Sequence, residues 1–289
     1  MIFSKENELS FEFFPPRNNK EYTNLEETYK VLSEFNPTFV SYTDGAGASK
    51  NRDIIKSVEI LRKYSDTEVV AHITSCDKEK IDVDLLLSEY QENNITSFLV
   101  IRGDCPTNEF LIDPDEIDFS GENEFRHASD LIKYLKDKGV SNIGFGAFPS
   151  GHPEDKSFDQ TVKTFKAKSD LGGNFSATQL FFDSKEYIRF HKTMKEEDSK
   201  VPIYAGIMPL LSLDQAKRFA QICDVELPKK LEEGFQKCES KEKERSFGIQ
   251  YITEMCNELM EYGVDGLHFY TLNRSKAFVD IYSNLETNN

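Results

Sequence analysis

Eight short runs of β-forming residues recur along the chain, and stretches with helical spacing separate most of them. The runs cover residues 10–14, 38–43, 68–74, 97–102, 142–148, 175–181, 203–208 and 266–270. Apolar residues three or four positions apart predict helices over about 21–35, 52–64, 81–92, 128–136, 157–171, 213–222 and 246–262, with shorter ones near 185 and after 274. This alternation predicts an α/β fold, and specifically a (β/α)8 TIM barrel.

An open, doubly wound sheet is the main alternative, because the same alternation allows it. Its dinucleotide fingerprint, Gly-x-Gly-x-x-Gly, does not follow the first run. The chain has no obvious linker or low-complexity segment, so a single domain over residues 1–289 is expected. Two charged or Pro/Gly-containing segments, 105–124 and 228–245, are predicted to be surface excursions.

Charge and hydropathy narrow the classes of partner. The formal net charge of −16 opposes binding to nucleic acid or to an anionic membrane. No apolar run is long enough to span a bilayer, and the N-terminus does not resemble a signal peptide. The five cysteines are scattered without a Cys-x-x-Cys pair, which predicts reduced thiols. A cytoplasmic protein is therefore expected.

The first run ends at a double proline and carries one carboxylate, Glu12. Alternation along a strand places Leu9, Phe11 and Phe13 on one side and Glu12 on the other, with Ser10. Desolvation near aromatic side chains disfavours the charged form of a carboxyl group. Glu12 is therefore a candidate general acid, although this stretch alone favours an ordinary solvated glutamate, since most glutamates are solvated.

Isolated polar residues gather at the predicted carboxyl ends of the runs, where barrel active sites form. They are Glu12, Thr43, His72, Arg102, Asp104, His152, Gln179, Tyr270 and Arg274. Each could be structural by itself, but their shared placement favours an active site. The sequence has neither a metal-ligand spacing nor a Gly-x-Ser-x-Gly nucleophile elbow, so no metal site is predicted. Redox chemistry at such a site would need an organic cofactor.

Six strings resemble the methylenetetrahydrofolate reductase family, occur in the family's order and extend over nearly the whole chain. They are residues 10–16, 72–74, 102–104, 151–153, 179–183 and 268–274. The resemblance implies a flavin-containing (β/α)8 barrel that reduces methylene-tetrahydrofolate to methyl-tetrahydrofolate, with electrons passing from a reduced nicotinamide through FAD. It also implies the short bacterial form without a C-terminal regulatory domain, a homo-oligomer, and a role in one-carbon metabolism that feeds methionine synthesis.

The resemblance also implies residue roles. Glu12 matches the acid that helps to open the methylene bridge of the folate, and Asp104 matches a carboxylate beside the flavin. The implied FAD-binding residues are Thr43, Ala46, His72, Arg102, Gly103, Asp104, Ala128, Phe148, His152 and Lys168. The implied substrate-binding residues are Gln179, Leu213, Tyr270 and Arg274. Arg102 and Lys168 suit a pyrophosphate, because arginine offers paired donors and lysine a point charge.

Several positions depart from the family pattern. Phe148 and His127 stand where tyrosines are usual, Leu213 where an aromatic residue is common, and Asp44 and Ser150 replace other usual residues. Two other hypotheses stay open, and these departures motivate the first. One is a barrel subunit of a larger electron-transfer complex, in which a partner receives the electrons. The other is a flavin barrel that oxidises an amino acid, which the folate-side residues do not favour.

Overall fold

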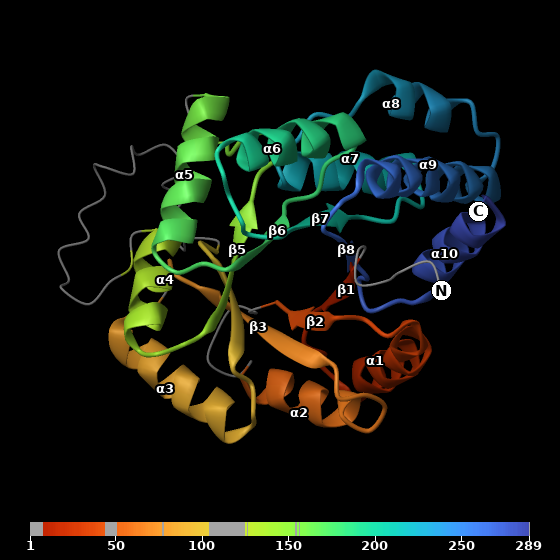
Figure 1. The fold of residues 1–289 in the computed structure, drawn as a ribbon. Helices are drawn as coiled ribbons and strands as arrows, with labels where there is room; N and C mark the ends of the chain where they lie inside the picture. The colour runs from red at the N-terminus through yellow and green to blue at the C-terminus, as the bar shows by residue number, and fades with distance from the viewer. Residues whose placement is uncertain are drawn as a thin grey trace.

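The eight β-like runs form a closed parallel barrel in the computed structural model (Figure 1), which describes residues 8–43, 51–76, 78–103, 125, 127–153, 155 and 157–288. The strands are β1 Glu8–Phe13, β2 Phe39–Tyr42, β3 Glu68–Thr74, β4 Ser97–Ile101, β5 Asn142–Ala147, β6 Phe175–Thr178, β7 Ile203–Ile207 and β8 Gly266–Tyr270. Each strand pairs with its sequence neighbours, and β8 closes the ring by pairing with β1. The barrel prediction is confirmed, and the open doubly wound sheet is excluded.

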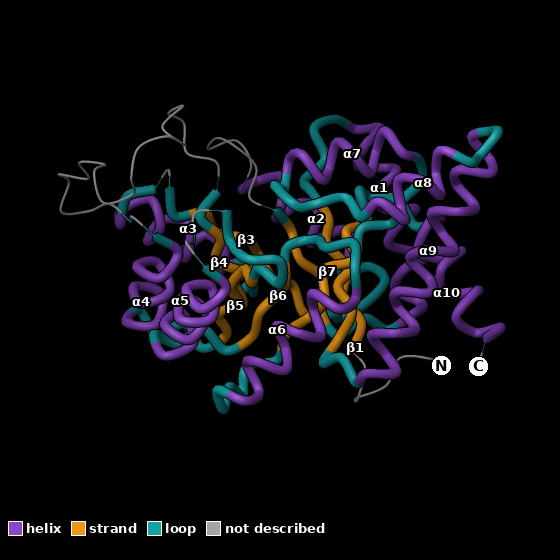
Figure 2. Tube along the Cα trace, turned by 90° about the horizontal axis from the view of Figure 1, so that it is seen from above, coloured by secondary structure: helices purple, strands orange, loops and turns teal. Residues whose placement is uncertain are grey.

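Helices surround the barrel on its outside (Figure 2). They are α1 Asn19–Leu32, α2 Asn51–Leu61, α3 Lys80–Glu92, α4 Ala128–Asp137, α5 Phe158–Asp170, α6 Ser184–Glu196, α7 Leu213–Ile222, α8 Lys229–Gln236, α9 Lys241–Tyr262 and α10 Lys276–Asn288, with a 3-10 turn at Ser33–Phe35. No helix among the described residues is both long and apolar enough to cross a membrane.

The segment 228–245 was predicted to be a surface excursion, and this prediction is wrong in detail. It contains α8, which buries Leu231 and Phe235, one turn apart on one helix face. It also contains the first turn of α9, which begins at Lys241 because Ser240 accepts a hydrogen bond from the Lys243 N–H at 3.3 Å. The sequence analysis missed both helices because the segment is rich in charged residues, and these charges lie on the outer faces of the helices.

β6 ends at Thr178, three residues before the predicted end of its run. The backbone turns at Gln179, whose N–H donates to the Ala147 carbonyl at 2.7 Å. The Gln179 side-chain oxygen accepts from the Leu180 N–H at 2.9 Å. Phe181 is buried, but it belongs to the connection that leads to α6.

β1 carries the predicted alternation of side chains. Leu9, Phe11 and Phe13 are buried in the large apolar layer between barrel and helices. Ser10 and Glu12 occupy the alternate positions; Ser10 is fully buried and Glu12 is half-buried. The stretch is therefore an interior strand of a closed barrel, and Glu12 belongs to the barrel lumen.

A second, smaller apolar cluster fills the barrel itself. It consists of Phe39, Val70, Leu99, Phe175, Ala177 and Tyr204. Phe39 and Phe175 open their strands, so this plug occupies the amino-terminal half of the barrel. The carboxyl-terminal half is left to polar side chains, which is where a barrel places its chemistry.

The cysteines only partly follow the prediction of reduced thiols. Cys223, Cys238 and Cys256 are free, whereas Cys76 is disulfide-bonded. Cys76 lies just after β3, where its N–H donates to the Arg102 carbonyl at 3.0 Å. Sequence spacing could not anticipate this bond, because tertiary structure decides which cysteines meet. The remaining cysteine, Cys105, lies outside the described residues.

Candidate active site

The closed parallel sheet brings most of the predicted site residues to one rim of the barrel. Glu12, His72 and Tyr270 lie near the carboxyl ends of β1, β3 and β8. Thr43, Arg102, Gly103, Phe148 and Gln179 follow directly after β2, β4, β5 and β6. Ala46 and Asp104 lie outside the described residues, so their roles stay predictions.

Glu12 stands between two buried histidines. Its Oε2 atom is 3.6 Å from Nε2 of His72 and 3.7 Å from Nε2 of His268. The side chains of His72 and His268 are 4% and 1% exposed, against 18% for Glu12. The carboxyl group is therefore the most accessible member of this trio, and it can meet a ligand that enters the barrel mouth.

His268 was not among the predicted site residues, although it opens the last family-like string. Its Nδ1 atom is 2.8 Å from the Ser10 hydroxyl, and its ring stacks on Phe39 at 5.6 Å between centroids. Strand pairing places it directly opposite Ser10. Alternation on β8 could have revealed it, because His268 shares the lumen face with Tyr270.

Tyr270 is held in place across the barrel. Its hydroxyl donates to the Thr178 carbonyl, and a Cβ atom on Gly206 would lie 2.5 Å from that hydroxyl and 2.3 Å from the carbonyl oxygen. Only glycine leaves room for this bond. Burial, together with the negative charge of Glu12, raises the pKa of Tyr270 well above its ordinary value. Tyr270 therefore remains a protonated donor.

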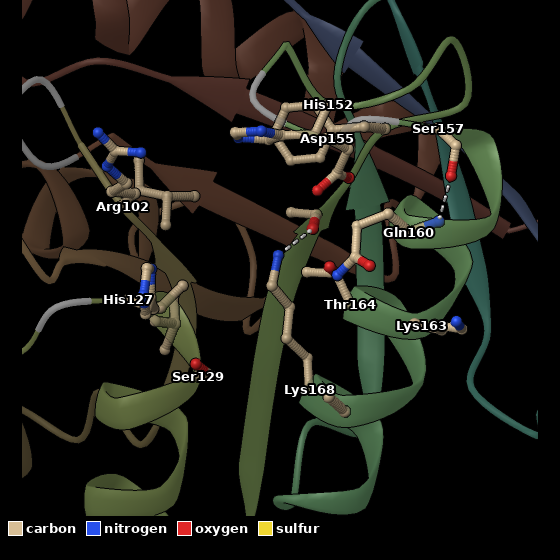
Figure 3. A pocket seen from close by; sticks show the side chains of 16 residues that line it. Arg102, His127, Ser129, His152, Asp155, Ser157, Gln160, Lys163, Thr164 and Lys168 are labelled. Carbon is tan, nitrogen blue, oxygen red and sulfur yellow. Dashed lines mark hydrogen bonds between the residues drawn. The ribbon is translucent and has the colours of Figure 1, made fainter. Parts of the chain in front are cut away.

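A pocket of about 670 Å³ lies between α4 and α5 (Figure 3). Five of the predicted cofactor residues line it together: Arg102, Ala128, Phe148, His152 and Lys168. The figure shows Arg102 and His127 on one wall, with His152, Gln160 and Lys168 on the other. The pocket therefore unites residues that are up to 66 positions apart in sequence, counted as 168 minus 102.

Lys168 is the most strongly perturbed cation of this pocket. Burial lowers its pKa to about 8, against a smaller opposing effect of Asp155. Its Nζ donates to the Gly146 carbonyl at 3.2 Å and lies 5.8 Å from the centre of the Phe148 ring. A desolvated ammonium gains from an anionic partner, so the site favours a negatively charged ligand group.

Several pocket residues were missed by the sequence analysis. Gln160, Thr164 and Ala167 line the pocket on the face of α5 that also carries Lys168. Their spacing of three or four residues is the signal that could have found them. The helix begins at this pocket because Ser157 accepts a hydrogen bond from the Gln160 N–H at 3.2 Å.

Three predicted cofactor residues do not line this pocket. His72 faces Glu12, and the Thr43 N–H donates to the Phe13 carbonyl at 3.0 Å. Gly103 has a positive φ of 82°, and a Cβ atom there would meet the Thr74 side chain at 2.6 Å. Glycine is thus required where the chain turns between Arg102 and the barrel mouth.

A second pocket, of about 220 Å³, opens between the ends of β7 and β8. Two predicted substrate residues, Tyr270 and Arg274, line it together with Arg245 and Lys276. Arg245 is ion-paired with Asp280, while Arg274 and Lys276 are exposed. Leu213, the first residue of α7, is half-buried and does not line this pocket.

Among the residues that the structure describes, no group of three or more His, Cys, Asp or Glu side chains could hold a metal ion. Fold and site define a (β/α)8-barrel protein with a carboxylic acid at the barrel mouth and two pockets that cationic side chains line.

The family model of methylenetetrahydrofolate reductase matches residues 1–286, and the chain belongs to this family. It is 32% identical over 269 residues to the 5,10-methylenetetrahydrofolate reductase of Escherichia coli, covering 93% of this chain and 87% of that one. The Salmonella typhimurium enzyme of the same name is 31% identical with the same coverage. These relatives indicate methylenetetrahydrofolate reductase activity.

A solved structure supports the fold independently. It is a Clostridium thermocellum protein, described as binding two copies of 5-methyl-5,6,7,8-tetrahydrofolic acid, with a TM-score of 0.64 and 15% sequence identity. The match covers 97% of this chain and 94% of that chain. At this identity, the likeness concerns the architecture of the barrel.

Proposed function

We propose that this enzyme reduces methylene-tetrahydrofolate to methyl-tetrahydrofolate, with FAD as cofactor and a reduced nicotinamide as electron donor. The observation that carries the proposal is the position of Glu12, an accessible carboxyl at the barrel mouth between two buried histidines. Family membership supplies the reaction class. The two pockets that cationic side chains line supply places for anionic ligands.

The larger pocket fits a flavin dinucleotide. Its volume of about 670 Å³ is of the size that binds organic cofactors. Arg102 and Lys168 from opposite walls would hold the pyrophosphate, and Ala128 leaves space at the start of α4. Bound FAD would supply the hydride chemistry that no side chain provides.

Glu12 would protonate the bound folate and so help to open its methylene bridge. General acid catalysis of this kind contributes about 10²- to 10⁴-fold to a rate. Barrel closure holds the carboxyl at the mouth, because β1 pairs with β2 and β8 on both sides. The Tyr270 hydroxyl is occupied by Thr178, which leaves Glu12 to serve as the proton donor.

The smaller pocket would receive the anionic tail of the folate. Arg274 and Lys276 offer exposed cations there, above the apolar Leu211 and Leu272. Gln179, which follows β6 at the same rim, would bind the pterin. The Clostridium protein with the same architecture is described as a methyl-tetrahydrofolate binder, which is consistent with a folate at such a barrel mouth.

Anaerobic flavin spectroscopy tests the proposal. The purified protein should be yellow, NADH or NADPH should bleach it, and methylene-tetrahydrofolate should restore the colour. A protein that never binds FAD would refute the proposal. If FAD binds but only a partner protein allows bleaching, the chain is instead a subunit of a larger electron-transfer complex.

Sedimentation tests the expected homo-oligomer, and cell fractionation tests the cytoplasmic location.

A further inference from the structure

The ring nitrogen of His268 that faces Glu12 is buried without a hydrogen bond in the described part of the structure. The imidazole is 1% exposed, and its Nε2 atom has no hydrogen-bond partner among the residues that the structure describes. A buried polar nitrogen without a partner is costly. The nitrogen faces Oε2 of Glu12 at 3.7 Å, close enough for a proton to be shared after a small movement of the glutamate side chain.

The other ring nitrogen determines the tautomer. The Ser10 hydroxyl lies 3.4 Å from the Leu267 carbonyl, to which it donates, and 2.8 Å from Nδ1 of His268. The Leu267 carbonyl offers an acceptor for the hydroxyl proton, and with the proton directed there the serine oxygen accepts from Nδ1–H. Neutral His268 then presents a bare Nε2 toward Glu12.

We propose that His268 is a positioning residue for the acid chemistry of Glu12, an inference that rests on the proposed function. Ser10 locks the imidazole in the Nδ1–H tautomer, so Nε2 of His268 and Oε2 of Glu12 hold one exchangeable proton between them. That proton leaves from Glu12 to the folate nitrogen. The carboxylate and the neutral imidazole then regain one proton from water, which restores the pair.

The surroundings of the pair favour this role. Phe39 covers one face of the His268 ring, and Tyr270 meets it edge-on with 5.6 Å between centroids. The other titratable groups packed around the pair in the described structure are His72, on the opposite side of Glu12, and Tyr270 itself. Tyr204 meets Phe39 edge-on with 5.0 Å between ring centroids, and its hydroxyl donates a hydrogen bond to Glu8.

Matched variants separate this role from a structural one. His268→Asn keeps an amide donor for Ser10 and removes the atom that faces Glu12. With FAD-loaded protein, the reoxidation of reduced flavin by methylene-tetrahydrofolate should slow by about 10- to 100-fold, within the range of general acid catalysis. The pH profile of this step should change, while bleaching by the nicotinamide should keep its rate. In a Glu12→Gln background, His268→Asn should cause no further loss.

A second measurement does not depend on turnover or on the fold of that variant. Nitrogen-15 spectra of the histidine side chains in the substrate-free protein should show the Nδ1–H tautomer for His268, and Ser10→Ala should abolish this preference. An Nε2–H tautomer in the wild-type protein would overturn the inference. The inference would also be overturned if His268→Asn slowed flavin reoxidation equally in the wild-type and Glu12→Gln backgrounds. If the wild-type flavin is never reoxidised by methylene-tetrahydrofolate, it is the proposed function that fails.

Discussion

The two ends of the barrel each carry a pair of histidine and carboxylate, and the pairs differ in how fully they are bonded. At the amino-terminal end, Asp265 precedes β8 and lies 3.1 Å from Nε2 of His191. Its Oδ2 also accepts from the Ile203 N–H at 2.8 Å, while Nδ1 of His191 is 2.9 Å from the Tyr262 hydroxyl. At the carboxyl-terminal end, Oε2 of Glu12 lies 3.7 Å from Nε2 of His268.

This difference indicates that the Asp265–His191 pair contributes to stability, whereas the Glu12–His268 pair is available for chemistry. Every polar side-chain atom of the Asp265–His191 pair has a partner, including Oδ1 of Asp265, which lies 3.6 Å from Nζ of Lys195. The pair therefore joins α6, α9, β7 and β8 and has nothing left to offer a ligand. Glu12 and His268 are held in place by their strands but are not hydrogen-bonded to each other. Incompletely bonded polar groups at the carboxyl end of a barrel are expected where a substrate completes the set.

The largest predicted effect tests the carboxyl end. Glu12→Gln should slow reoxidation of the flavin by methylene-tetrahydrofolate by roughly 10³-fold, because the amide cannot donate an acidic proton. Reduction of the flavin by the nicotinamide should stay within about two-fold of wild type, since only the folate step loses an interaction. Stopped-flow measurement of both half-reactions decides. An equal loss in both would make Glu12 a scaffold residue.

The matching change at the amino-terminal end should affect folding. Asp265→Asn should lower the free energy of unfolding by about 2 kcal/mol at pH 7, because it weakens hydrogen bonds to a buried charged group. The two half-reactions of the folded protein should be unchanged. Denaturant titration with parallel kinetics checks both. A loss of catalytic rate without a loss of stability would contradict the division between the two ends.

The pH dependence of this stability has a defined sign. Burial raises the pKa of Asp265, but the hydrogen bonds from His191 and the Ile203 N–H outweigh it, and the net shift is downward. A lowered carboxyl pKa stabilises the folded state above the unfolded value, and this stability is lost as the pH falls through the folded value. The difference between wild type and Asp265→Asn should therefore shrink below about pH 4.

Lys168 tests the cofactor pocket on the carboxyl side. Lys168→Met should weaken FAD binding by about 10-fold, which corresponds to one charge-assisted contact. Affinity of the wild type should fall as pH rises above about 8, because the unbound lysine then loses the charge that attracts the pyrophosphate. Fluorescence titration of FAD from pH 7 to 10 measures this slope.

Lys163→Met is the matched control for this test. Lys163 lies on the same helix and lines the same pocket, but it is exposed. Solvent screens an exposed charge, so its loss should cost at most a few-fold in affinity and leave the pH slope intact. If both variants changed FAD affinity and its pH dependence equally, the burial of Lys168 would not explain its effect.

The smallest effect is expected in the smaller pocket, which is proposed to receive the folate tail. Lys276→Ala should raise the KM for methylene-tetrahydrofolate by about two- to five-fold, because exposed ion pairs contribute about 1 kcal/mol or less. The rate of flavin reduction should not change. Lys230→Ala, at an exposed position of α8 that does not line the pocket, is the control. A similar rise in both variants would indicate a general charge effect.

The sequence by itself determined the barrel and singled out Glu12 as the candidate acid. Repeated alternation of strand and helix patterns can bury its apolar faces in few ways, and the period of two on β1 placed Glu12 on the side opposite Leu9, Phe11 and Phe13 before any contact was known. The cluster of Arg102, Ala128, Phe148, His152 and Lys168 was predicted from motifs, and parallel closure of the barrel made it one pocket.

Only the tertiary structure decided which residues contact one another. His268 lies 256 positions from Glu12 in sequence, counted as 268 minus 12, and only the pairing of β8 with β1 brings them together. The same holds for the pocket face of α5, for the buried helix α8 and for the disulfide-bonded state of Cys76. Spacing encodes the period of each element, whereas hydrogen-bonding state and burial depend on which elements the closed ring sets side by side.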